Sequence, residues 1–201
     1  MPFMNRPASL ASFFGLAVAW FLALTILWMQ VSAWTSYPAA SIAHIVLSNG
    51  AGHWVRSIHK APGRFEVETR IAVDIPGKGQ GELVAEADPA HHAYGLPLFL
   101  ALLLASGSPY PLRRALAGYV ILLAPQAFSV TFDILKQIIV AGGNHELLGI
   151  ARWQMESIAL GYQFGTLLLP TLAPVALWLW LDRAFFAAVI ADGWLRKAAA
   201  G

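Results

Sequence analysis

The sequence predicts a mainly α-helical integral membrane protein, with four transmembrane helices and a small external α+β segment of two or three antiparallel strands between the first two helices. The first observation is composition. Of the 201 residues, 58% are hydrophobic and 12% are charged, and the mean hydropathy of +0.60 lies outside the range of an average soluble domain. The second observation is the presence of four long apolar stretches. The third is one intervening stretch, 35–92, in which polar and apolar residues mix.

The four apolar stretches are candidate transmembrane helices, each of which needs about 17 to 25 mostly apolar residues. They cover 10–34, 93–108, 115–140 and 158–181. We expect the first to be a retained helix, because its apolar core is longer than that of a cleaved signal peptide. The second is the shortest, and the sequence leaves open whether it crosses the bilayer fully.

Basic residues predict the orientation, because Lys and Arg accumulate on the cytoplasmic flanks of transmembrane helices. They precede the first helix, fill the connection between the second and third, and follow the fourth: Arg6, Arg113, Arg114, Arg183, Arg196 and Lys197. An even number of spans with both termini in the cytoplasm places all of them on one side. The predicted organisation is a tail and first helix over 1–34, a periplasmic segment over 35–92, and three helices with a cytoplasmic tail over 93–201, in a bacterial inner membrane.

The external segment has a pattern of its own. Residues 65–73 alternate apolar and polar positions, as in a strand with one buried face. The other predicted elements are a short helix over 38–47, a strand over 54–58, turns over 61–63 and 75–80, and a returning strand over 82–86. So small a sheet needs a covering layer. We expect the short helix, the membrane surface or a partner protein to cover its apolar face.

Two charges, Asp133 and Lys136, follow the uncharged run 115–132. Their i to i+3 spacing places them on one helix face, where they can neutralise each other. Gln126 lies one heptad before Asp133 and Gln137 lies beside Lys136, so the polar stripe is longer than the pair. Charges at the edge of hydrocarbon need a partner, a water-lined cavity or an interface. The stripe is therefore either an ion pair near the external interface, or a polar docking face or cavity wall.

A Gly-x-x-x-Gly pattern lies in the fourth stretch, at Gly161 and Gly165. Glycines at this spacing allow two helices to approach closely. We therefore expect these two residues to pack against another helix, with no chemical role.

Several kinds of chemistry have no signature in this sequence. The absence of cysteine excludes disulfides, thiol nucleophiles and thiolate metal sites. No His-Glu-x-x-His or Gly-x-Ser-x-Gly motif occurs, and the adjacent His91 and His92 point apart on a helix or a strand. A net charge of +2 gives no reason to expect nucleic acid. We therefore predict no catalytic residue, no cofactor and no metal.

Three segments carry a family resemblance, at 87–105, 132–137 and 153–174. With these segments in this order, the chain resembles the exosortase H-associated membrane proteins. The resemblance implies a small bacterial inner-membrane protein that accompanies an exosortase, an integral-membrane, transpeptidase-like enzyme that processes C-terminal sorting tails. It implies no catalytic residues for this chain. A cysteine-free chain also lacks the Cys, Arg and His set expected of the exosortase itself.

Two hypotheses follow for the function. The first is a non-catalytic accessory protein of the lipid bilayer, which binds an exosortase or another membrane protein, or the substrate of the exosortase. It uses the external sheet and the polar stripe of the third helix. The second is a small transporter component or a membrane-embedded enzyme, in which a cavity near the helix-interrupting prolines is lined by four polar residues: Asp133, Lys136, Gln126 and Gln163.

Overall fold

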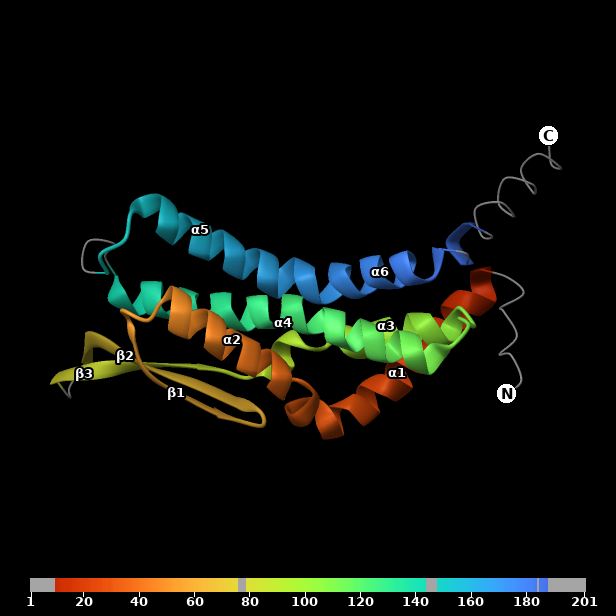
Figure 1. The fold of residues 1–201 in the computed structure, drawn as a ribbon, viewed down its shortest axis with the longest axis horizontal. Coiled ribbons are helices and arrows are strands. Elements are labelled where there is room, and N and C mark those ends of the chain that lie inside the picture. The colour runs from red at the N-terminus through yellow and green to blue at the C-terminus, as the bar shows by residue number, and fades with distance from the viewer. Residues whose placement is uncertain (1–9, 76–78, 144–147, 184, 188–201) are drawn as a thin grey trace. The chain divides into compact units, whose positions relative to one another are not determined.

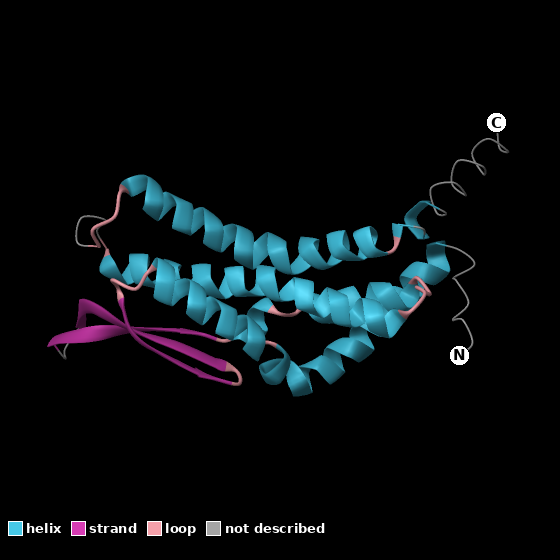
Figure 2. Cartoon of the chain, viewed as in Figure 1, coloured by secondary structure: helices cyan, strands magenta, loops and turns pink. Residues whose placement is uncertain are grey.

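The computed structural model describes all residues except 1–9, 76–78, 144–147, 184 and 188–201. In chain order its elements are α1 (Leu10–Thr35), α2 (Tyr37–Gly50), β1 (Val55–Ala61), β2 (Arg64–Ile75), β3 (Gly79–Ala87), the 3₁₀-helix η1 (Pro89–His92), α3 (Gly95–Ala105), α4 (Pro111–Gly142), α5 (Arg152–Gln163), the π-helical turn η2 (Phe164–Leu168) and α6 (Leu169–Leu181) (Figure 1). The protein is mainly helical and has one small antiparallel sheet (Figure 2). The fold class predicted from the sequence is confirmed at this level.

Three helical stretches in the described part of the chain are long and apolar enough to cross a membrane. They are Leu10–Gly50, Pro111–Gly142 and Arg152–Leu181. The fourth predicted span is not confirmed. Its helix, α3, has 11 residues and is about 16 Å long at 1.5 Å per residue, roughly half of a hydrocarbon core of about 30 Å.

The chain divides into two compact units. The helical unit comprises the described residues of Met1–Met29, Gly95–Leu122 and Thr171–Gly201. The sheet unit comprises those of Gln30–Tyr94 and Leu123–Pro170. Of the residues used to predict orientation, Arg6, Arg196 and Lys197 lie outside the described residues, as does the 76–78 part of the predicted second turn.

The sheet of the sheet unit is a meander in the order β1-β2-β3, with both pairs antiparallel. A two-residue turn at Pro62 and Gly63 joins the first two strands, because Ala61 pairs directly with Arg64. Gly63 has a φ of 77°, which a residue without Cβ adopts at little cost. All three predicted strands are present, and each is displaced or longer than the apolar alternation alone indicated.

The apolar face of the sheet is covered by α2 and by the second part of α4. Phe65 and Val67 of β2 are completely buried. They belong to one cluster with small and branched residues of both helices: Ala40, Ala43 and Leu47 of α2, and Val130, Ile134 and Ile138 of α4. The short helix predicted over 38–47 is therefore part of the covering layer, and α4 supplies the rest.

Helix α4 also packs closely against α5 and η2. A Cβ at Gly161 would lie 2.1 Å from the ring of Phe132, and a Cβ at Gly165 would lie 3.1 Å from Ser129 Cα. Ser129 Oγ donates to Gly165 O at 2.7 Å. The two glycines thus stand where a side chain would separate the helices.

In the helical unit, aromatic rings join α1 to the end of α6. Phe13 stacks on Trp178 with ring centroids 5.5 Å apart, and Phe185 lies 5.0 Å from Phe13. Helix α3 packs against α4, since a Cβ at Gly118 would meet the ring of Phe99 at 2.2 Å. These contacts form the second apolar cluster of the protein.

Candidate functional site

Asp133 contacts His92. Its Oδ2 atom lies 3.3 Å from His92 Nε2, and the two side chains are 21% and 6% exposed. Among the described side chains, Asp133 and Lys136 form no ion pair with each other. The partner of Asp133 is instead a residue 41 positions away in the sequence.

The local structure before α3 positions His92. Asp88 accepts a hydrogen bond from the Ala90 amide at 2.9 Å and begins η1, with Pro89 at its first position. In this single turn the two adjacent histidines point apart. His91 is largely exposed and lies near Asp88, while His92 turns inward to α4.

Gln137 joins α4 to the outer edge of β3. Its Nε2 atom donates to Glu86 O at 2.8 Å, and its Oε1 atom accepts from Glu86 N at 3.1 Å. A side-chain amide has the same donor and acceptor as a peptide group, so Gln137 pairs with Glu86 as a neighbouring strand would. Its Nε2 atom also lies 3.5 Å from Asp133 Oδ1, one turn earlier on the helix.

The other polar residues singled out from the sequence do not join this group. The Lys136 ammonium lies 4.8 Å from the ring centre of Tyr162, a cation–π contact. Gln126 is buried, and its Oε1 atom has no hydrogen-bond partner in the described structure. Gln163 is exposed on α5. Asp133 and Gln137 are therefore the two that share one network, and His92 and Glu86 complete it.

A second buried network, in the helical unit, was missed from the sequence. The Asp182 side chain is 1% exposed and lies 3.2 Å from Arg114 Nη1. Ser106 Oγ donates to its Oδ2 atom at 2.7 Å, and Trp178 Nε1 donates to Ser106 Oγ at 3.4 Å. Arg114 also donates to Ser108. One feature of the sequence indicates this network: the acidic residue Asp182 directly follows the apolar run of α6.

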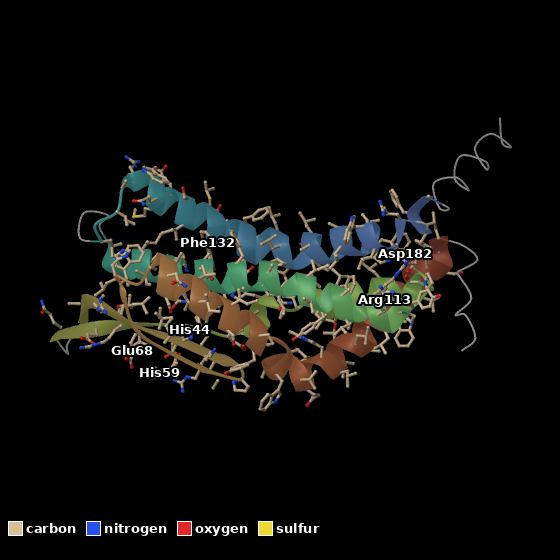
Figure 3. All side chains as sticks on the ribbon, in the orientation of Figure 1. His44, His59, Glu68, Arg113, Phe132 and Asp182 are labelled. Atoms are coloured by element: carbon tan, nitrogen blue, oxygen red, sulfur yellow. The ribbon has the colours of Figure 1, made fainter. Side chains whose placement is uncertain are left out.

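The outer face of the sheet carries paired charges. His59 Nε2 lies 3.7 Å from Glu68 Oε1, and Figure 3 labels both residues on the strands. Arg56 pairs with Glu82 across the sheet. These side chains are 44% to 63% exposed. The sheet thus has one buried apolar face and one exposed face of alternating charge.

Ser57 lies near His59, and Ser41 lies near Lys60. Neither contact has the geometry of a catalytic nucleophile and its base. Ser57 Oγ lies 3.3 Å from His59 Nε2 but donates to Glu68. Glu68 approaches the same nitrogen, whereas a triad acid holds the other one. Ser57 and Lys60 form the one Ser-x-x-Lys spacing on this sheet, but Lys60 donates to Ser41 Oγ at 3.1 Å and lies over the ring of Tyr37. The contacts of Ser57 and Lys60 therefore hold surface side chains in place.

The fold and its networks define a membrane protein whose helices support a small, charged sheet. Comparison with family models identifies it more closely. Residues 7–185 match the family described as exosortase H-associated membrane protein, and the chain belongs to this family. The resemblance noted from the sequence is confirmed. No curated protein and no solved structure matches the chain.

Proposed function

We propose that this protein is a non-catalytic accessory protein of the bacterial inner membrane that binds exosortase H or its substrate. Membership of the exosortase H-associated family over residues 7–185 is the observation that carries the proposal. The name of the family indicates an association with exosortase H. The exposed, charged face of the sheet is a surface suited to such a partner.

Contacts within the protein already occupy the polar stripe of α4. Both carboxylate oxygens of Asp133 have neighbours, His92 and Gln137. Lys136 faces Tyr162. An Asp133→Ala change would therefore disturb the internal packing of the sheet unit and would be a poor test of docking. Of the residues first considered for partner binding, Gln163 is the exposed one and remains a candidate contact.

The outer face of the sheet is better suited to a partner. Its Arg, His and Glu side chains alternate in sign and, apart from the partly covered Glu66, are at least 44% exposed. Complementary charges on a partner give specificity and register more than raw affinity. We infer that a polar segment of the exosortase or of its substrate, carrying charges of both signs, binds across the outer face of the three strands.

The length of α4 supports an external position for this face. The helix has 32 residues, about 48 Å, whereas the uncharged run 115–132 accounts for about 27 Å, close to one hydrocarbon core. Ile134 and Ile138, which pack under the sheet, follow that run. The three-stranded sheet would then stand outside the hydrocarbon, on the periplasmic side in the orientation that we propose.

Copurification with exosortase H tests the proposal. We would express the full chain with exosortase H and compare Glu68→Lys/Glu82→Lys on the outer face with Arg152→Glu/Glu156→Lys on α5. Both doubles alter exposed, ion-paired side chains. We expect the outer-face double to reduce the recovered complex by about tenfold or more, as for like charges at an interface, and the α5 double to leave it unchanged. Equal recovery for both would refute docking on this face.

The alternative function, a transporter component or a membrane-embedded enzyme, has less support from the contacts. It required Asp133, Lys136, Gln126 and Gln163 to line one cavity. Instead Asp133 and Lys136 contact different side chains, and Gln163 is exposed.

A further inference from the structure

Several chain segments meet at one end of the helical unit. Ser106, just beyond α3, and Arg114, in the first turn of α4, both contact Asp182 at the end of α6. Phe13, near the start of α1, packs on Trp178. The start of α1, the α3–α4 connection and the end of α6 therefore lie together.

Two exposed arginines, Arg113 and Arg183, lie at this end of the helical unit. Arg114 forms an ion pair with the buried Asp182. Arg113 and Arg183, the sequence neighbours of that pair, are exposed. No described acidic side chain forms an ion pair with either of them. Figure 3 labels Arg113 and Asp182 at the same end of the helices. Since Asp182 is paired with Arg114, the two exposed positive charges have no acidic partner among the described residues.

Large apolar side chains project beside these arginines. Tyr110 and Leu112, in and just after the α3–α4 connection, are 79% and 84% exposed. Trp180, two residues before Asp182, is 59% exposed. Aromatic and aliphatic residues next to basic ones are typical of the boundary between hydrocarbon and head groups.

We propose that this end of the helical unit binds the phosphate of an anionic phospholipid, through Arg113 and Arg183. A guanidinium matches the geometry of phosphate oxygens and binds them with two hydrogen bonds. The exposed Tyr110 and Leu112 favour a lipid over free phosphate, because a lipid brings acyl chains that cover them while its head group meets the charges. Neither family membership nor the docking face of the sheet enters this inference.

Native mass spectrometry of the full chain in detergent tests it, with phosphatidylglycerol as the anionic probe and phosphatidylcholine as the zwitterionic one. The test variant is Arg113→Gln/Arg183→Gln. Its matched control is Arg70→Gln/Arg152→Gln, which removes the same net charge from exposed arginines of the sheet unit. Each basic residue near an anionic leaflet contributes about fivefold. We therefore expect the test variant to bind phosphatidylglycerol about 30-fold more weakly, and the control to bind as the unmodified chain does.

Three results would overturn the proposal: equal phosphatidylglycerol binding by the test variant, an equal loss in the control, or displacement of the lipid by an equimolar amount of inorganic phosphate. The double Arg113→Lys/Arg183→Lys keeps the charge but loses the planar guanidinium, so it should recover part of the affinity. Circular dichroism of each variant confirms that the helices are intact. A failure to recover with lysine, in a folded variant, would refute recognition by charge.

Discussion

Replacing Gln137 with leucine tests how the sheet is joined to α4. Gln137 makes two hydrogen bonds with the Glu86 backbone, at 2.8 and 3.1 Å. Leucine is of similar size and is a good helix former, but it has neither the donor nor the acceptor. The change therefore removes both bonds and leaves the helix intact.

The expected loss of stability follows from these two bonds. Each contributes about 0.5 to 1.5 kcal/mol net, and a pair about 1 to 3 kcal/mol. Glu86 lies at an exposed edge, where water can replace part of the interaction, so we expect about 1 to 2 kcal/mol. Gln137→Glu should cost more, because it removes the donor and brings a second carboxylate close to Asp133, which lies 3.5 Å from Gln137 Nε2.

Thermal unfolding in detergent, followed by tryptophan fluorescence, measures the effect. Trp54, whose Nε1 atom donates to Leu148 O at 3.1 Å, reports on the sheet unit. At about 2 to 4 °C per kcal/mol for a chain of this size, Gln137→Leu should lower the Tm by about 2 to 8 °C. Hydrogen exchange at the Glu86 amide should accelerate. Gln163→Leu on exposed α5 is the matched control and should change neither. An unchanged Tm together with unchanged Glu86 exchange in Gln137→Leu would refute the reasoning.

Two further predictions concern helix packing and the buried charge. Gly161→Ala should destabilise the protein by about 1 to 3 kcal/mol, as overpacking does, because the added Cβ would meet the Phe132 ring. Gly15→Ala is the control, because there is open space around Gly15. Equal Tm values for the two variants would contradict the predicted overpacking. Asp182→Ala should cost about 2 to 4 kcal/mol, since breaking a buried pair costs about 3 to 5 kcal/mol and Arg114 keeps some hydration. Arg114→Ala should lower the stability more than the double Arg114→Ala/Asp182→Ala does, because the single change leaves the buried Asp182 carboxylate without its arginine. A larger loss in the double variant would refute the role of the unpaired carboxylate.

Local patterns in the sequence were sufficient to predict the sheet. Alternation over 65–73 has a period of two, which a half-buried strand imposes, and Phe65, Val67 and Thr69 are indeed buried on one face. The extent of the strands was harder to predict. Their ends depend on pairing between strands, as in the register of Phe65 with Ala87, and apolar alternation does not report pairing. For α3, the apolar run 93–108 predicted a helix but overestimated its length, since the helix covers Gly95–Ala105.

The partners of the charged residues could not be predicted in the same way. The i to i+3 rule describes an isolated helix, where Lys136 is the nearest opposite charge to Asp133. In the folded chain, η1 brings His92 to Asp133, and α6 brings Asp182 to Arg114. Both contacts join residues distant in the sequence, so they depend on the arrangement of the helices. Spacing identifies which charges need a partner, and the fold decides which partner each one obtains.

The positions of these partners separate structural charges from charges available for binding. An acid that is buried and paired, such as Asp182, is costly to expose and so contributes to the fold. An exposed charge beside it that forms no ion pair with a described acidic side chain, such as Arg183, contributes little to stability and can meet a ligand. The same division holds in the sheet unit, where Asp133 faces inward and the His59–Glu68 pair faces outward. Substitutions at the outward group should therefore change binding with little effect on Tm, whereas substitutions at the inward group should change Tm first.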